Sequence, residues 1–251
     1  MARQLREQYE GAFYHVRSRG NAEMDVFLDD GDRVRFLRHL SSTVQKHGLR
    51  CHAYCLMSNH YHLLLETPHG NLADGMKDLN GIYTQSFNFK HQRAGHVFEG
   101  RYRARAIKDE IDLLQVARYI VLNPVRAGLV QDPGAWRWSS YRTMCASDAG
   151  EAYLTESLIL SYFVDAHEST REGYREFVLE GLSAETERKR RPPLVDLIPG
   201  EGSKQEIERA IYVAFVEHDY SQREIARYLG FHHSKVSKII SRVANECATG
   251  V

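Results

Sequence analysis

Two histidines separated by one residue are the first group in this chain with an obvious chemistry. His60 and His62 flank Tyr61 in a short apolar run that is typical of a β-strand. Alternate residues of a strand point to the same face, so both imidazoles should project together while Tyr61 turns towards the core. Imidazole nitrogen is a common ligand of divalent metal ions. The pair predicts a metal site, and two partly buried histidines bonded to polar neighbours are the alternative.

A tyrosine one helical turn away from an asparagine is the second such group. Tyr119 and Asn123 are four residues apart in an amphipathic segment, so they share one face of the expected helix. A phenol is mostly protonated at neutral pH, and its attack on a phosphate would need a metal ion to polarise that phosphate. His60, His62 and Asn123 could hold Mg²⁺ or Mn²⁺ for this purpose. The alternative for Tyr119 is one more core aromatic among 14 tyrosines.

Hydrophobic periodicity predicts the elements that must position these groups. Strands are expected at residues 12–19, 49–57, 60–67 and 97–108, and helices at residues 30–47, 71–87 and 109–122. The βαββαβ order predicts an α+β fold of the ferredoxin-like, split βαβ type, with an antiparallel sheet and both of its helices on one face. The tyrosine lies on an added helix. Asn123-Pro124 should end that helix near Leu122, because proline disfavours helical geometry in the residue before it.

Two local features of the helices can also be predicted. Asn71 stands where an asparagine commonly caps the start of a helix. In the first helix, apolar residues recur at spacings of three and four and should form the stripe that faces the core. These residues are Val34, Leu37, Leu40 and Val44.

Basic residues surround both chemical groups. The predicted DNA contacts of this region are Arg101, Arg103, Arg105, Lys108, Arg118 and Arg126. The first three alternate along the expected strand and would share one face as a track for a phosphate backbone, with Tyr102 on the opposite face. Arg118 and Arg126 flank Tyr119, where a guanidinium can hold a phosphate with two hydrogen bonds. Solvated charged faces are the alternative for each.

Composition sets the class of protein. The 251 residues are 43% hydrophobic and 26% charged, which supports a packed core and excludes wholesale disorder. The formal net charge is zero, but it is unevenly distributed: 0 over residues 1–89, +5 over 90–142, −8 over 143–187 and +3 over 188–251. Two basic regions separated by an acidic one suit a protein that grips a polyanion at two places.

Targeting and redox features point to the cytoplasm. No apolar run approaches the roughly 18 to 20 residues of a membrane span, and the start of the sequence lacks the apolar stretch of a signal peptide. The four cysteines are too few and too scattered for a disulfide framework or a thiolate zinc site. We therefore expect reduced cysteines and no membrane association.

The C-terminal segment predicts a separate DNA-binding unit. Residues 221–230 form a capped short helix that ends at a glycine, and a second helix starts near His233. This is the pattern of a helix-turn-helix, with a helical hairpin for protein contacts as the alternative. The residues expected to reach DNA are His233, Ser234, Lys235 and Lys238. The expected organisation is a nuclease domain (1–145), an acidic helical extension (146–187), a basic, proline-containing linker (188–203) and a helix-turn-helix domain (204–251).

Four strings of the N-terminal region together resemble a known family. SNHYHLLLETP, VFEGRYRARAIKDE, ARYIVLNPVRAGLV and WRWSSYR are similar to sequences of the IS200-like single-tyrosine transposases. The asparagine-proline pair and the WRWSSYR segment resemble the REP-associated tyrosine transposases within that family. The resemblance covers about residues 9–145.

The resemblance implies a role for each matching residue. His60 and His62 would be metal ligands, Asn123 the third ligand, and Tyr119 the nucleophile that cleaves single-stranded DNA and becomes linked to the 5′ phosphate. In the insertion-sequence enzymes a glutamine commonly stands where this chain has Asn123. The DNA partner would be single-stranded and near a hairpin such as a repeated extragenic palindrome. Relatives of the two kinds suggest dimers or monomers, so self-association is left open.

Three functions remain for comparison. The first is a metal-dependent single-stranded DNA endonuclease and strand transferase, that is, a transposase. The second is a non-enzymatic DNA-binding regulator that uses the helix-turn-helix, against which the intact His60, His62 and Tyr119 count. The third is a hydrolytic metalloenzyme built on the histidines, which lacks an HExxH or comparable carboxylate pattern.

Overall fold

The computed structural model describes residues 8–146, 151–164, 169–190, 192–200, 202–218 and 220–249. Contacts divide the chain into two compact units, residues 1–179 and 180–251. The first unit contains the sheet and the histidine pair, and the second is helical. No helix among the described residues is long and apolar enough to cross a membrane.

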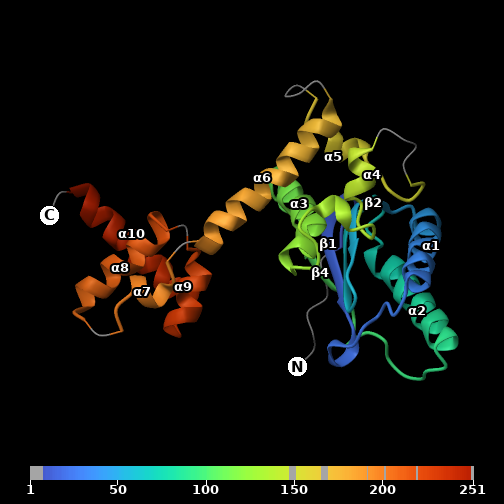
Figure 1. The fold of residues 1–251 in the computed structure, drawn as a ribbon, viewed down its shortest axis with the longest axis horizontal. Coiled ribbons are helices and arrows are strands. Elements are labelled where there is room, and N and C mark those ends of the chain that lie inside the picture. Colours follow the sequence, from blue (N-terminus) through green and yellow to red (C-terminus); the bar gives the residue numbers. More distant parts are fainter. Residues whose placement is uncertain are drawn as a thin grey trace. The chain divides into compact units, whose positions relative to one another are not determined.

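The first unit is built on an antiparallel sheet with the order β2-β3-β1-β4. Its strands are β1 (Ala12–Arg19), β2 (Arg50–Leu56), β3 (His60–Thr67) and β4 (Arg103–Ala106). Helices α1 (Asp30–His47) and α2 (Leu72–Lys90) pack on each other on one face, and α3 (Glu110–Arg126) covers β2 and β3 on the other (Figure 1). The predicted α+β fold of ferredoxin-like type is confirmed, including the added helix that carries Tyr119.

Strand β1 separates the two faces residue by residue. Ala12, Tyr14, Val16 and Ser18 are buried, and the residues between them are half-buried. This alternation follows from the two-residue period of a strand. It directs the half-buried set, which includes His15 and Arg17, to the face covered by α3, where His15 contacts Tyr119.

Helix α1 has the predicted bounds, but its buried stripe differs from the prediction. Its start is fixed by a capping box between Asp29 and Asp32, and its end by Gly48 in a left-handed conformation. Phe36, Leu40 and Val44 are buried, whereas Val34 is exposed. Leu40 and Val44 therefore belong to both the predicted and the observed stripe, but the observed one includes the fully buried Phe36, which packs against Phe27 and Tyr83, in place of Val34.

Two other local predictions are wrong. Asn71 precedes α2 but makes no side-chain cap; its amide instead donates to the carbonyl of His47 at the end of α1, over 2.8 Å. The strand expected over residues 97–108 is limited to β4, with a single bridge between Gly20 and Phe98 before it. Around that bridge, Val97 and Glu99 are bonded through their backbones to Asn21 and Arg19, and residues 96–98 and 100–102 line a cavity together with α2.

Helix α3 continues through the proline that was expected to end it. Pro124 lies inside the last turn, and the helix extends to Arg126. Proline has no N–H to offer the carbonyl four residues earlier. The side-chain amide of Asn123 donates to that carbonyl, of Ile120, over 3.4 Å and to the carbonyl of Tyr119 over 2.8 Å. The asparagine thus replaces the missing backbone donor.

The segment Trp136–Arg142 protects the outer edge of β2. The amide of Leu56 donates to the carbonyl of Trp138, and the amide of Ser140 donates to the carbonyl of Tyr54. The indole of Trp136 donates to the carbonyl of Leu56. An edge strand with unpaired backbone groups would otherwise be open to pairing with another chain. After this segment come α4 (Tyr141–Cys145), α5 (Ser157–Ser161) and α6 (Thr170–Arg190).

The second unit forms around its own apolar core. Its helices are α7 (Leu194–Leu197), α8 (Lys204–Val216), α9 (Gln222–Leu229) and α10 (His233–Thr249). Ser221 and Glu224 form a capping box at the start of α9, and Gly230 ends it in a left-handed conformation. Ile225 and Val236 are fully buried in the core between these helices. The two predicted helices and the turn between them are therefore present.

Candidate nuclease site on the sheet

The two histidines of β3 lie next to Tyr119 of α3. The ring of His62 is 5.7 Å from the ring of Tyr119 and 5.0 Å from the ring of His60, measured between centroids. His62 is almost fully buried. Tyr119 is 38% exposed, so the residue remains accessible from solvent. A strand with a two-residue period and a helix packed across it bring the histidine pair together with a tyrosine that follows His62 by 57 residues in the sequence.

A third histidine completes the cluster. His15 of β1 stacks on His62 with ring centroids 5.1 Å apart, and its Nε2 is 2.9 Å from Nδ1 of His62. Its ring also lies edge-on to Tyr119 at 5.7 Å. His15 was not predicted from the sequence, although its signal was present: the alternation of β1 puts it on the same face as His60 and His62 once β1 pairs with β3.

The pKa of each histidine in the cluster is lowered, mainly by burial, which disfavours the charged ring. The pKa of His15 falls to about 4, with Arg105 and Arg17 as further causes. The pKa of His60 also falls to about 4, and that of His62 to about 2. All three rings are therefore neutral at pH 7 and retain a lone pair for hydrogen bonding or for a metal ion.

Arg17 is a second residue that was not predicted from the sequence. In the sheet register it stands between His62 on β3 and Arg103 on β4. Directly opposed residues of antiparallel strands share a face, so these side chains form a row across the sheet. The charge of Arg17 contributes to the lowered pKa of His15, His60 and His62. The signal was again the alternation of β1, which places Arg17 two residues after His15.

The predicted arginine track is partly neutralised by carboxylates. Arg105 forms a bidentate ion pair with Asp112, over 2.7 and 2.9 Å, and Arg103 pairs with Glu99 over 3.3 Å. Arg101 lies outside β4, and it lines the same cavity as Tyr102. The expectation that Arg101, Arg103 and Arg105 share a strand face with Tyr102 opposite is therefore wrong, because regular pairing begins only at Arg103.

The other residues predicted to contact DNA or metal in this unit lie at different distances from Tyr119. The guanidinium of Arg126 lies over the Tyr119 ring, 4.7 Å from its centroid. Arg118 instead stacks on Phe177 at 4.4 Å and donates to the carbonyl of that residue. Lys108 is exposed at the end of β4. Asn123 is buried, and its recorded hydrogen bonds run to carbonyls of its own helix.

One group among the described residues brings three possible metal-ligating atoms within 4.8 Å of one another, and it lies away from the histidine cluster. It consists of Asp29, Asp32 and His91. Lys90 binds both carboxylates, over 2.6 and 2.7 Å, and Asp32 accepts the backbone amide of Leu28. The two carboxylates therefore serve as the cap of α1, and Lys90 offsets their charge.

In the C-terminal unit, the predicted DNA-contacting residues are all on the surface. His233, Ser234, Lys235 and Lys238 are exposed, whereas Val236 is buried. Ser234 bonds to His232 over 2.8 Å, and the ammonium of Lys235 lies 3.5 Å from the centroid of the Phe231 ring. Contact with DNA remains a prediction for these residues.

Comparison with known proteins agrees with the fold. Residues 8–123 match the family described as "Transposase IS200 like". A putative REP-associated tyrosine transposase from Haemophilus influenzae (strain ATCC 51907 / DSM 11121 / KW20 / Rd) is 30% identical over 100 residues, which cover 36% of this chain and 57% of that protein. This chain therefore matches little more than half of the length of that relative.

One solved structure shows a similar architecture, and a second matches over less of this chain. A REP-associated tyrosine transposase bound to a REP hairpin superposes with a TM-score of 0.50 and 16% identity, over 62% of this chain and 92% of that chain. A putative transposase from Deinococcus radiodurans is 23% identical over 47% of this chain and 95% of its own, with a TM-score of 0.35. The residues 8–123 that match the IS200-like transposase family contain the histidine cluster, Tyr119 and Asn123.

Proposed function

We propose that this protein is a metal-dependent single-stranded DNA endonuclease and strand transferase whose nucleophile is Tyr119. The observation that carries the proposal is the packing of the half-exposed Tyr119 ring against His62 and His15, with Arg126 over its face. An accessible phenol beside neutral imidazoles and a guanidinium has the parts that phosphoryl transfer needs: a nucleophile, possible metal ligands and a cation for the phosphate. The family that residues 8–123 match supports the same reaction.

The residues of the cluster fit a divalent metal ion. Nδ1 of His60 lies 2.7 Å from the amide oxygen of Asn59, which can only accept, so Nδ1 carries the proton and Nε2 keeps the lone pair. If Nδ1 of His62 donates to His15, the Nε2 lone pair of His62 is likewise directed away from that bond. His60 and His62 would hold the ion, and the amide oxygen of Asn123 would be its third protein ligand. Bound there, Mg²⁺ or Mn²⁺ would polarise the scissile phosphate.

The reaction exchanges one phosphodiester for another. The Oη atom of Tyr119 attacks the scissile phosphorus, and the bond to the 3′ oxygen breaks in line with it. The phenolic proton is lost as the new bond forms, and the leaving oxygen takes up a proton to become a free 3′ hydroxyl. The products are a 5′-phosphotyrosine and a free 3′ end. Attack by a different 3′ hydroxyl on the phosphotyrosine would complete strand transfer.

Positively charged side chains of this protein would hold the DNA during these steps. Arg17, between His62 and Arg103, and Arg126, over Tyr119, are placed to contact the phosphates on either side of the scissile bond. Arg103 and Arg105 would exchange Glu99 and Asp112 for phosphates at a modest cost, because both pairs are solvent-exposed. Lys108 would extend the contact beyond β4.

We further propose that the substrate is single-stranded DNA next to a hairpin. The solved relative of similar fold is bound to a REP hairpin. The second unit presents Lys235 and Lys238 on α10 after a short capped helix and a turn, which suits contact with a duplex stem. Replacing both lysines with alanine should weaken duplex binding and reduce its salt dependence, because each phosphate contact releases counterions.

The test of this function is a denaturing gel of the protein incubated with labelled hairpin oligonucleotides that carry single-stranded flanks, with and without Mn²⁺. We expect a protein-DNA adduct that needs the metal and that Tyr119→Phe abolishes, while binding in a native gel is retained. Cleavage by Tyr119→Phe would overturn the assignment of the nucleophile. Binding without any adduct, across varied flanks, would favour a non-enzymatic DNA-binding regulator.

A further inference from the structure

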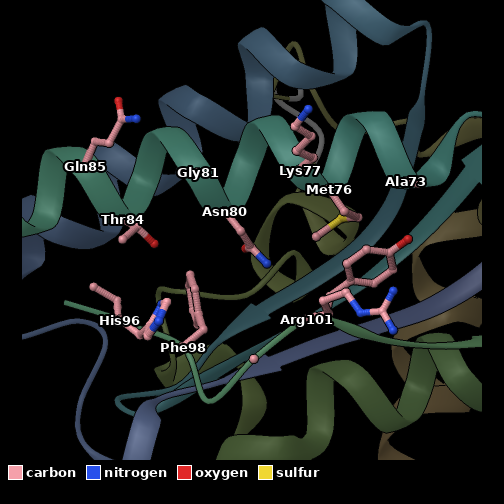
Figure 2. Close-up of a pocket in the computed structure, with 13 residues that line it drawn as sticks. Ala73, Met76, Lys77, Asn80, Gly81, Thr84, Gln85, His96, Phe98 and Arg101 are labelled. Atoms are coloured by element: carbon pink, nitrogen blue, oxygen red, sulfur yellow. The ribbon is translucent and has the colours of Figure 1, made fainter. Parts of the chain in front are cut away.

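A second recess lies on the opposite face of the sheet from the histidine cluster. It is a cavity of about 730 Å³ between α2 and the segment 96–102 (Figure 2). The stripe of α2 that faces it has the spacing of one helix face, from Ala73 through Met76 and Asn80 to Thr84. Met76, Asn80 and Thr84 point from the helix towards Phe98 and Arg101 on the facing segment (Figure 2). The volume falls in the roughly 300–1,000 Å³ range of small-ligand sites.

The walls of the cavity are mainly apolar, with polar groups at a few points. Met76, Phe98 and Tyr102 supply apolar and aromatic surface. Thr84 and His96 add hydrogen-bonding groups, and neither side chain has a hydrogen bond to another described residue; Gln85 points away from the facing segment (Figure 2). An aromatic and polar lining of this kind suits a flat, heteroaromatic ligand better than an aliphatic one.

The charged residues that line the cavity are all basic. Arg101 and Lys77 contribute to its lining, and no aspartate or glutamate does so among the described residues. Arg101 has no ion pair within the described part of the chain. Arg103 and Arg105 on the following strand, β4, are instead paired with Glu99 and Asp112. The guanidinium that faces the cavity is therefore the one that could bind an external anion without first breaking an ion pair.

We propose that this cavity binds one or two unpaired nucleotides of a single-stranded DNA flank, with a base against Phe98 and Tyr102 and a phosphate on Arg101. The proposal rests on the function proposed above for its choice of nucleic acid. Bases in a duplex are stacked and paired, so only an unpaired base can enter a recess of this kind. Stacking on aromatic side chains combined with basic residues is the usual means of holding single strands.

The segment from Arg101 to Arg105 connects the cavity with the histidine face. Arg101 and Tyr102 line the cavity, and Arg103 stands in the row that runs through Arg17 to His62. Strand β4 is the edge of the sheet, so a bound strand can pass around it without crossing the core. The cavity would therefore hold nucleotides that lie beyond the cleavage site on the same strand.

Gly81 offers a direct test, because a side chain added there would enter open space. It is one of the α2 residues that line the cavity, beside the stripe from Ala73 to Thr84, and no atom comes within 4 Å of the position of an added Cβ. Gly81→Trp should fill the cavity, whereas Gly81→Ala adds only a methyl group and favours the helix. The probes are a hairpin oligonucleotide with single-stranded flanks and the same hairpin without flanks, with binding measured by fluorescence anisotropy on the full chain in a Tyr119→Phe background.

We expect Gly81→Trp to bind the flanked hairpin about 5- to 100-fold more weakly, the range that loss of one base-aromatic contact produces, and the blunt hairpin as before. Arg101→Ala should also weaken binding of the flanked hairpin, and the exposed Arg35→Ala on α1 is its charge-matched control. A 2-aminopurine base in the flank should lose fluorescence on binding to the Gly81→Ala variant and keep it with Gly81→Trp.

Unchanged binding of the flanked hairpin by a folded Gly81→Trp protein would overturn the proposal. Equal weakening of both probes would overturn it as well, because the cavity would then not distinguish unpaired nucleotides. Thermal melting of the two Gly81 variants establishes that both are folded. The binding readout does not depend on cleavage, so failure of the nuclease function would show separately, as the absence of the Tyr119-dependent adduct.

Discussion

The two faces of the sheet are made of the same strands but differ in chemistry. On β3, Tyr61 is fully buried towards α1 and α2, where its hydroxyl donates to the amide oxygen of Asn80 over 2.5 Å and lies 3.0 Å from the hydroxyl of Ser18. Its neighbours His60 and His62 point to the other face and join His15 and Tyr119. One face thus stabilises the fold and the other carries titratable and nucleophilic groups. The two-residue period of a strand is what allows adjacent residues to serve these separate purposes.

The largest expected difference between the two faces is in the cleavage rate, and it should appear when the proposed metal ligands are replaced. His62→Ala, and separately His60→Ala, should lower the rate of adduct formation by at least about 1,000-fold, because polarisation of the phosphate would be lost. Binding of the flanked hairpin should change much less. Rates are measured by single-turnover cleavage with Mn²⁺. A rate within about tenfold of that of the unmodified protein would remove these histidines from the reaction.

A smaller effect is expected at His15, which would act by orienting His62. Replacement by alanine removes the partner of Nδ1 of His62, at 2.9 Å, and should raise the metal concentration needed for half-maximal cleavage by about 10- to 100-fold. His15→Gln retains a polar group and should recover part of that loss. An equal loss of rate at all metal concentrations would instead indicate a role in contact with the substrate.

The pH dependence of stability offers a third comparison. The pKa of His52, which is fully buried behind Glu66 and the carbonyl of Thr155, is lowered mainly by burial. The unfolded chain therefore binds more protons than the folded one below about pH 6.5, and the free energy of unfolding should fall as the pH drops. The change has an upper limit of about 1.4 kcal/mol per pH unit for each such histidine.

Urea denaturation at pH 7 and at pH 5 measures this dependence. The decrease in the free energy of unfolding should be smaller in His52→Gln than in the unmodified protein. An identical pH dependence in the two proteins would mean that His52 does not contribute to it.

The smallest effect is expected on the core face. Tyr61→Phe removes the hydroxyl that bonds to Ser18 and Asn80 and should lower the free energy of unfolding by about 1 kcal/mol. The cleavage rate should stay within a factor of about two, although the residue lies between the two proposed metal ligands. Urea denaturation and the single-turnover assay measure the two quantities. A large loss of rate with unchanged stability would break the division between the faces.

Local patterns in the sequence were sufficient to predict most of the sheet. The bounds of β1, α1 and β3 agree with the predictions. Each of these elements has a clear apolar pattern, and a residue that ends the element follows, such as Gly48 after α1. The region after α2 was less predictable. Its alternating arginines resemble a long strand, but β4 begins only at Arg103, and only the packing against α2 reveals the cavity.

The candidate site was partly predictable for the same reason. His60, His62 and Tyr119 have spacings that indicate a shared face, and the structure brings them together. His15 and Arg17 join them through the pairing of β1 with β3, a register that neither strand specifies alone. Pro124 predicts the end of a helix from backbone sterics, but the side-chain bond from Asn123 allows the helix to continue.

The nucleophile can be identified most directly by mass spectrometry of the trapped adduct. The protein is incubated with a flanked hairpin and Mn²⁺, the DNA is digested to a short remnant, and the protein is cleaved with trypsin. We predict that the remnant is linked through a phosphate to Tyr119, in the peptide that ends at Arg126. A remnant on any other residue, or an adduct that persists in Tyr119→Phe, would contradict the assignment of Tyr119 as the nucleophile.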